Sequence, residues 1–154
     1  MTMQTYVFFD EENLPTLGKL QTAIIENGFD YQLPENMNLA SKSPELIKGT
    51  FEGLESCVDY LYDTYQVEDW EWNDDDIKIL RNPNVVSVFN TYSNAQEIAG
   101  MLVISSVLAK ITSGVMLSDF FDDELIPTDD CIEFAQEIIE NSRDQFSGSS
   151  KMRA

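Results

Sequence analysis

The alternation of apolar and polar positions predicts that the chain begins with a strand followed by a helix. Tyr6–Phe9 is rich in aromatic and β-branched residues, which is typical of a strand. Thr16 can cap a helix with one apolar face, and Gly28 is placed to end it. The apolar positions of that face are Leu17, Leu20, Ile24 and Ile25. Alternation then predicts a second strand at Phe29–Leu33.

Two periodicities overlap in the segment from Leu46 to Tyr65. A helix is compatible with the three-and-four spacing of Phe51, Leu54, Val58, Leu61 and Tyr65. A strand is compatible with the alternation of Val58, Tyr60 and Tyr62, all residue types that favour strands. We favour a β-hairpin that turns at Gly53. A further strand is predicted at Asn84–Asn90, which makes the sheet largely antiparallel.

The longest predicted helix follows Ser93-Asn-Ala-Gln96, which has the spacing of a capping box headed by Ser93. From Ile98 to Ile111 apolar residues occupy nearly every face, so this helix should be buried at the centre of the fold. Gly100 can let another element approach it closely. A short strand is expected at Val115–Leu117.

A last amphipathic helix is predicted after Pro127. Thr128 is expected to cap it, and Asp129 and Asp130 suit the positive end of the helix dipole. Its core-facing positions are Ile132, Ala135, Ile138 and Ile139. The predicted fold class is therefore α+β, with a mostly antiparallel sheet packed against a long buried helix and two amphipathic helices. We expect one domain over residues 1–146 and a disordered tail over residues 147–154.

The charge adds an expectation about partners that the apolar pattern does not contain. Among 154 residues, 28 Asp and Glu stand against 9 Lys and Arg with no histidine, for a formal net charge of −19. At 43% hydrophobic content the chain is still expected to bury a core and fold. Such a surface repels nucleic acid and anionic membranes and attracts basic proteins. The expected partner is thus a protein with a basic surface.

Localisation and redox state follow from what the sequence lacks. The first ten residues have neither the basic region nor the cleavage site of a secretory signal. The apolar, uncharged stretch Ile98–Ala109 is shorter than the roughly 20 residues that a membrane span needs. We therefore expect a cytoplasmic protein. Cys57 and Cys131 are expected to be buried free thiols, and the oligomeric state is left open.

Missing residue types exclude several kinds of catalysis. Without histidine there is no Ser-His or Cys-His pair and no histidine metal ligand. The seven glycines form neither GxxxxGK[ST] nor GxGxxG. We expect a non-enzymatic protein without cofactor or metal site. An enzyme that relies on carboxylates and a bound divalent metal stays open as a third hypothesis.

The densest candidate site is an acidic run around two tryptophans, with the order Glu68-Asp-Trp-Glu-Trp-Asn-Asp-Asp-Asp76. It fails as an EF-hand loop, because that loop needs alternate ligands, a central glycine and a final glutamate. As a binding surface, the tryptophans would be anchors and the acids would pair with Lys or Arg. The alternative is that one tryptophan fills the core and the acids solvate a loop. The candidate binding residues are Glu68, Asp69, Trp70, Glu71, Trp72, Asp74, Asp75 and Asp76.

A second segment, Asp119-Phe-Phe-Asp-Asp-Glu124, repeats this composition of acids and aromatics. Its candidate binding residues are Asp119, Asp122, Asp123 and Glu124. The alternative is a connecting loop that buries its two phenylalanines. The N-terminal acids Asp10–Glu12 are expected to form a solvated turn.

Two stretches carry a resemblance to a known family. Ser93–Ile126 has Asn-Ala-Gln-Glu-Ile-Ala, then Val-Leu-Ala-Lys-Ile-Thr-Ser-Gly-Val-Met-Leu, then an acidic loop, and the opening Tyr-Val-Phe-Phe-Asp precedes Leu-Pro-Thr. Together they resemble small bacterial immunity proteins of polymorphic or contact-delivered toxin systems, over about half of the chain. The resemblance implies a cytoplasmic inhibitor that covers a cognate toxin, and the charge favours a basic nuclease. The alternative function is an acidic nucleic-acid mimic that inhibits a DNA-binding defence protein.

Overall fold

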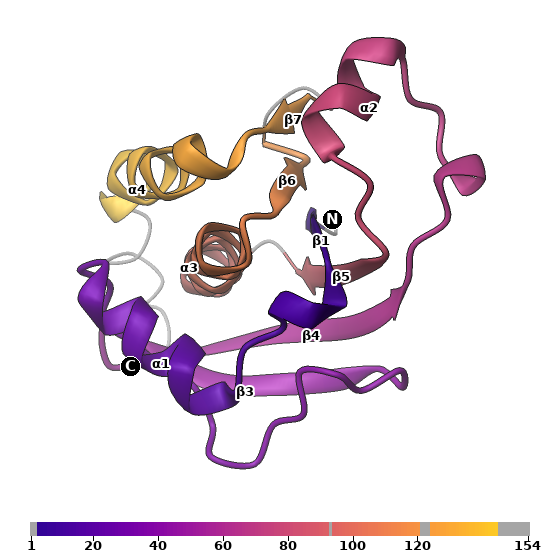
Figure 1. The fold of residues 1–154 in the computed structure, drawn as a ribbon. Helices are drawn as coiled ribbons and strands as arrows, with labels where there is room; N and C mark the ends of the chain where they lie inside the picture. The colour runs from indigo at the N-terminus through magenta and orange to yellow at the C-terminus, as the bar shows by residue number, and fades with distance from the viewer. Residues whose placement is uncertain (1–2, 93, 121–123, 145–154) are drawn as a thin grey trace.

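A seven-stranded sheet curls around one long helix in the computed structural model, which describes residues 3–92, 94–120 and 124–144 (Figure 1). The strands are β1 Met3–Phe9, β2 Tyr31–Gln32, β3 Glu45–Phe51, β4 Leu54–Thr64, β5 Val85–Thr91, β6 Val115–Ser118 and β7 Leu125–Ile126. The α-helices are α1 Leu17–Glu26, α2 Asp74–Leu80, α3 Ala95–Thr112 and α4 Cys131–Asn141. Short 3-10 turns lie at η1 Glu11–Asn13, η2 Val67–Asp69 and η3 Thr128–Asp130.

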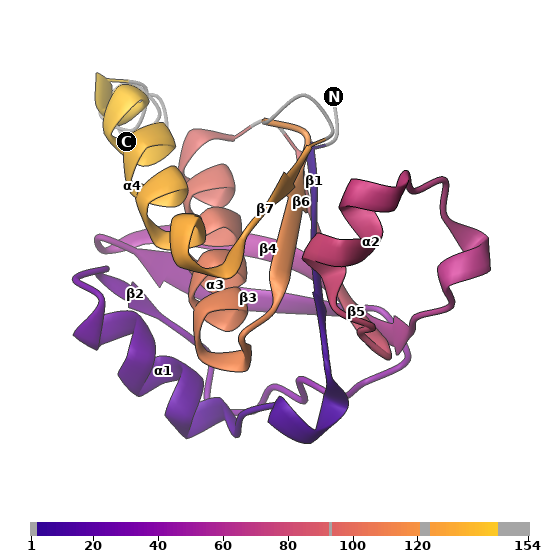
Figure 2. The same cartoon turned by 45° about the horizontal axis from the view of Figure 1, so that its top comes forward.

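The strand order is β2-β3-β4-β5-β1-β6-β7, and each neighbouring pair is antiparallel. Helix α3 lies in the hollow of the curved sheet, with α1 and α4 beside it, whereas α2 lies across the sheet from them (Figures 1 and 2). This confirms the predicted α+β class with its antiparallel sheet, long buried helix and two amphipathic helices. The predicted tail, residues 147–154, lies outside the described residues.

Helix α3 is enclosed by protein along most of its length, and only its last turn, with Lys110 and Ile111, is exposed. It packs against α1, α4 and strands β1, β3, β4, β5 and β6. Its buried hydroxyls are satisfied within the helix: Ser105 Oγ donates to the Met101 carbonyl at 2.7 Å, and Thr112 Oγ1 to the Leu108 carbonyl at 2.7 Å. Polar residues are therefore tolerated in this helix because they bond back to the preceding turn.

The sheet approaches α3 closely at Gly100, as predicted. A Cβ on Gly100 would lie 2.7 Å from Tyr31 Cε2 and would also meet Ser56 Oγ. Both neighbours are fixed, because Ser56 Oγ donates to the Gln96 carbonyl at 2.7 Å and the Tyr31 hydroxyl donates to the Ser56 carbonyl at 2.9 Å. The helix can lie this close to β4 only because residue 100 has no side chain.

The segment from Leu46 to Tyr65, in which helical and strand periodicities overlap, forms the predicted hairpin of β3 and β4. Phe51 is paired with Leu54 next to the turn. The two turn residues, Glu52 and Gly53, have φ angles of 49° and 81°. Two consecutive positive φ angles are typical of a two-residue hairpin turn, because they match the twist of the flanking strands. A helix through this point would have negative φ angles at both residues. Val58 and its alternate neighbours Tyr60 and Tyr62 face α3, so the alternation was the correct signal.

Several predicted helix ends are wrong in detail. The N-cap of α3 is Asn94, whose Oδ1 accepts from the Gln96 and Glu97 amides; the predicted cap, Ser93, lies one residue earlier and outside the described residues. Thr128 does not cap the last helix. It opens η3 and its hydroxyl donates to the Gly114 carbonyl, while α4 begins at Cys131. The Thr128 hydroxyl therefore donates to a distant carbonyl and does not accept from an amide of the helix that follows it.

Other predicted elements differ in extent. The cap at Thr16 is confirmed, since its Oγ1 accepts from the Lys19 amide at 3.2 Å. Ile25 is 49% exposed and is not part of the core-facing stripe of α1. The strand predicted at Phe29–Leu33 is shorter in the structure: only Tyr31 and Gln32 pair with β3, at the edge of the sheet. Helix α2 and strand β7 were not predicted.

The close approach at Gly100 leads to a test of stability. Gly100→Ala should destabilise the protein by about 1–3 kcal/mol, since overpacking against Tyr31 and Ser56 outweighs the gain of about 1 kcal/mol in helix propensity. Gly18→Ala in α1 is the matched control, because nothing lies within 4 Å of its would-be Cβ, and it should stabilise by up to about 1 kcal/mol. Urea unfolding followed by circular dichroism measures both. Equal effects of the two variants would contradict the packing.

Deprotonation of buried side chains should unfold the protein at high pH. Burial raises the pKa of Tyr31 and Tyr60 well above the usual 10.0, and it raises the pKa of Cys131 from 9.0 to about 12. The folded chain then holds protons that the unfolded chain releases, so this contribution to stability is complete below about pH 9 and is lost as the pH rises towards 12. Urea midpoints measured between pH 7 and 11.5 should fall accordingly.

Tyr60→Phe isolates one of these groups. It removes the hydrogen bonds of the Tyr60 hydroxyl to the Leu39 carbonyl and Ser87, so it should lower stability at pH 7 but flatten the loss above pH 10. Tyr92→Phe is the control for burial, because Tyr92 is 64% exposed and its pKa is raised mainly by a hydrogen bond to Asp59 and by the Asp59 charge. If the two variants lose stability with pH equally steeply, burial of Tyr60 does not govern the alkaline transition.

Candidate partner-binding site

Between β4 and β5 the chain makes an excursion over the sheet face opposite α3, which we call the outer face. This excursion, residues 65–82, includes η2 and α2 and contains the acidic run Glu68–Asp76 (Figure 2). The outer face is apolar because alternate residues of the strands point to it, such as Phe8, Val86 and Val115. The excursion therefore covers a second, smaller core.

The two tryptophans of the run form the cover of this second core. Trp70 and Trp72 are stacked with ring centroids 5.2 Å apart and planes within 4°. Both meet Phe8 edge-on, with centroids at 5.1 and 5.6 Å, a geometry that aromatic pairs favour. Trp72 Nε1 also donates to the Tyr65 hydroxyl at 2.8 Å. These contacts hold the run in one position on the sheet.

This arrangement changes the interpretation of the tryptophans. Both are half-buried, and both contribute to the second core, whereas the sequence suggested either two anchors or one core residue. Their main contacts are within the chain, so their first role is to attach the acidic run to the outer face of the sheet. We call the stacked pair Trp70 and Trp72 the aromatic platform of the run. Anchoring of a partner by their exposed parts stays a prediction.

The acids of the run point to solvent from this platform. Glu68, Asp69, Glu71, Asp74 and Asp75 are exposed. None of them forms an ion pair with any residue of the described ranges. Neighbouring carboxylates without ion-pair partners, which outnumber the one lysine of α2, Lys78, give a locally negative potential that attracts a basic partner.

Asp76 differs from the other acids because it stabilises α2. Asn73 Oδ1 accepts from the Asp76 amide at 2.8 Å, and Asp76 Oδ2 accepts from the Asn73 amide at 3.2 Å. This reciprocal pair is a capping box. The spacing of Asn73 and Asp76 before Ile77 was a readable sign of the helix, although the run of acids suggested a loop.

The second acidic segment starts at the end of β6. Asp119 is exposed, accepts from the Gln4 amide through Oδ2 at 2.9 Å, and donates its own amide to the Gln4 carbonyl at 3.2 Å. Glu124 is exposed just before β7. The predicted residues Asp122 and Asp123 lie outside the described residues. Phe120 is half-buried against the main core, in accord with the alternative of a connecting loop.

Tyr6 of β1 lies between the two acidic segments. Its ring centroid is 5.2 Å from that of Trp70, in an edge-on contact. Burial raises the pKa of Tyr6, and the nearby Asp119 carboxylate raises it further. Asp119 is therefore within electrostatic reach of a ring that contacts the run. The structure brings the start of the second segment to the same outer face, which the sequence did not show.

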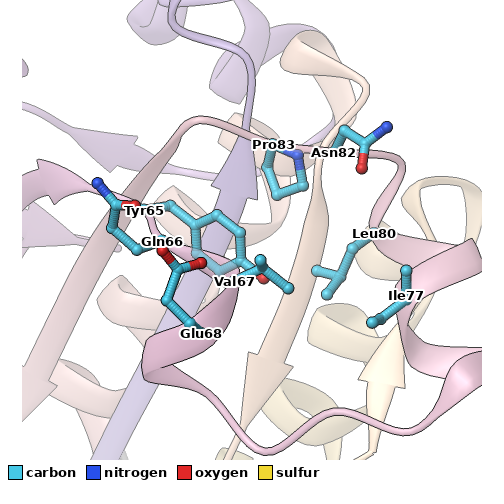
Figure 3. A pocket seen from close by; sticks show the side chains of 8 residues that line it. All are labelled: Tyr65, Gln66, Val67, Glu68, Ile77, Leu80, Asn82 and Pro83. Carbon is cyan, nitrogen blue, oxygen red and sulfur yellow. The ribbon is translucent and has the colours of Figure 1, made fainter.

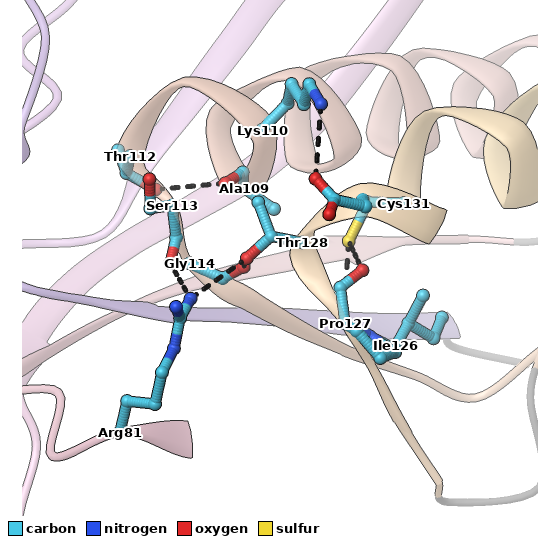
Figure 4. A network of polar contacts seen from close by, with 11 residues as sticks. Arg81, Ala109, Lys110, Thr112, Ser113, Gly114, Ile126, Pro127, Thr128 and Cys131 are labelled. Atoms are coloured by element: carbon cyan, nitrogen blue, oxygen red, sulfur yellow. Dashed lines mark hydrogen bonds and ion pairs between the residues drawn. The ribbon is translucent and has the colours of Figure 1, made fainter. Parts of the chain in front are cut away.

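Arg81 fastens the excursion to the rest of the fold (Figure 4). It ends α2 in the left-handed conformation, with φ of 57°, and its Nη2 donates to the Ser113 carbonyl at 2.8 Å and to Thr128 Oγ1 at 3.4 Å. The Ser113 carbonyl lies at the C-terminal end of α3, where a cation is favoured by the helix dipole. Sequence reasoning missed Arg81, because its partners are distant along the chain.

The described residues offer little for metal or thiol chemistry. Within residues 3–92, 94–120 and 124–144, no group of three or more Cys, Asp or Glu side chains is arranged to hold a metal ion. Both cysteines are free thiols, but only Cys131 is buried as predicted; Cys57 is half-buried. Burial raises the pKa of both thiols.

The chain gives no match to protein-family models, to curated proteins or to solved structures. Among the described residues, α3 alone is long and apolar enough to cross a membrane, with a mean hydropathy of 1.3, but 78% of it is buried inside the protein. A core helix has the same composition, because it is also surrounded by apolar groups.

Removing the Arg81 contact should loosen α2. Arg81→Met keeps most of the side-chain stem but loses both hydrogen bonds, so hydrogen exchange of the α2 amides should accelerate by roughly two- to ten-fold, as expected for a lost bond worth about 0.5–1.5 kcal/mol. Lys78→Met, an exposed cation on the same helix, is the matched control. Exchange measured by mass spectrometry over residues 74–80 tests this. Identical rates in the two variants would show that Arg81 does not hold the excursion.

Proposed function

We propose that the protein is an immunity protein that binds a cognate bacterial toxin in the cytoplasm and covers its active or substrate-binding surface. The observation that carries this proposal is the set of exposed, unpaired acids of the run, held on a fixed aromatic platform. A basic nuclease fits best as the toxin, because it must hold phosphates with Lys and Arg. An anionic surface complements such a groove directly.

The placement of the acids supports inhibition by rapid association. Electrostatic complementarity raises association rates more than it raises affinity. Since the tryptophan stack and Arg81 hold the excursion in place, little ordering entropy is lost when a partner binds. The formal net charge of −19 adds long-range attraction to a cationic protein.

The resemblance of Ser93–Ile126 to immunity proteins supports the same function. This stretch includes the buried helix α3 and the strand β6 that follows it. The resemblance concerns structural positions and assigns no binding residues. The acidic surfaces therefore come from this chain's own geometry, and the class of partner comes from their charge.

A matched pair of neutralised variants tests the surface. The run variant combines Asp69→Asn, Glu71→Gln and Asp75→Asn, and it spares Asp76 because that residue caps α2. The control variant combines Glu26→Gln, Glu133→Gln and Glu137→Gln, exposed acids of α1 and α4, and changes the net charge equally. For a basic toxin encoded beside this protein, the run variant should associate about three- to ten-fold more slowly at 20 mM NaCl, and the control variant far less.

Stopped-flow association at 20 and 500 mM NaCl, together with the toxin's catalytic activity at equimolar inhibitor, provides the measurement. Equal rates for the two variants would remove the run from the interface. A failure to inhibit any neighbouring toxin, combined with DNA-competitive binding to several unrelated basic proteins, would favour the nucleic-acid mimic instead.

A further inference from the structure

A pocket opens between η2 and α2, at the base of the acidic run (Figure 3). Its volume is about 230 Å³. That is smaller than the roughly 300–1,000 Å³ typical of small-molecule sites, so it suits a single long side chain. Its lining residues are Tyr65, Gln66, Val67, Glu68, Ile77, Leu80, Asn82 and Pro83.

Two apolar side chains of this pocket are unusually open to solvent. Val67 is 46% exposed and Ile77 is 42% exposed, and they approach the pocket from η2 and α2 respectively. The buried Leu80 side chain extends this apolar wall (Figure 3). An apolar surface of this kind gains free energy when the aliphatic part of a side chain covers it.

The rest of the rim is polar and negatively charged. Glu68 and Gln66 lie on one flank of the pocket, and Ile77 and Leu80 lie on the other, beyond the Tyr65 ring and Val67 (Figure 3). Glu68 has no ion-pair partner within the described chain. The Glu68 carboxylate is also close enough to Tyr65, a lining residue, to affect its pKa. Burial raises the pKa of Tyr65, the hydrogen bond from Trp72 partly offsets this, and the negative charge of Glu68 raises it again.

We infer that this pocket receives one Lys or Arg side chain of the basic partner, with the aliphatic stem against Val67 and Ile77 and the cationic head at Glu68. Lys and Arg are the residues whose stems cover apolar surface while their charges stay at a polar rim. A second copy of this chain is disfavoured as the occupant by the repulsion between two surfaces of net charge −19. The inference rests on the proposed function and adds where and how a cation of the partner is held.

Three blocked tripeptides of identical length serve as probes: acetyl-Gly-X-Gly-amide with X as arginine, lysine or norleucine. Norleucine has the unbranched aliphatic stem without the charge. Methyl resonances of Val67, Ile77 and Leu80 in the isotope-labelled protein report occupancy of the pocket, at constant ionic strength. The arginine and lysine peptides should shift these resonances saturably, with dissociation constants several-fold lower than that of the norleucine peptide.

Two variants and one control separate the parts of the site. Glu68→Gln should weaken the binding of the two cationic peptides by about two- to five-fold, the range of an exposed ion pair. The affinity for the norleucine peptide should be unchanged. Ile77→Ala should weaken the binding of all three peptides, because it removes part of the apolar wall. Glu26→Gln removes an equal charge from α1 and should change none of them.

The inference is overturned if the pocket methyl groups do not respond, if norleucine binds as well as arginine, or if Glu68→Gln and Glu26→Gln behave alike. These results are independent of the toxin experiment. A toxin that associates through the run while the pocket stays empty would retain the proposed function without this inference. Cation-selective occupancy without any inhibited toxin would retain the pocket and remove the immunity function.

Discussion

The enclosure of α3 is the constraint on which the remaining structure depends. A helix with apolar residues on nearly every face is destabilised wherever that apolar surface is exposed to water. A flat layer of strands covers only one side of such a helix and is therefore not sufficient. The antiparallel sheet curls around it, and α1 and α4 close the open sides. Close contact with β4 then requires the absence of a side chain at Gly100, and the buried hydroxyls of Ser105 and Thr112 must bond within the helix.

The position of the acidic run follows from this enclosure. The central strands are apolar on both faces: Val7 and Phe9 point to α3, whereas Phe8 points to the outer face. A strand with apolar residues on both faces must be covered on both faces, and Trp70 and Trp72 cover Phe8 on the outer face. With the aromatic rings turned inward, the acids between and beside them are left facing solvent. The same packing that completes the second core thus presents the charged surface that we propose for binding.

Local signals in the sequence predicted most elements and some of their ends, such as the cap at Thr16, but not their tertiary partners. The alternation in β4 and the apolar α3 were reliable because burial on the sheet or inside the core demands those patterns. Thr128 failed as a cap because the Gly114 carbonyl, fourteen residues away, offered it a tertiary partner. Helix α2 was missed because its first turn is entirely acidic, although Asn73 and Asp76 carried the signature of its cap.

The sequence by itself determined the fold class, the central helix, the hairpin and the concentration of acids beside aromatic residues, because these depend on residue type and spacing. Only the tertiary structure decided which face the run occupies, that Tyr6 lies between Trp70 and Asp119, and that Val67 and Ile77 meet across a pocket. Each of these joins residues that are distant in the chain or in separate elements. Their proximity is set by strand order and by burial of both sheet faces, which no local pattern encodes.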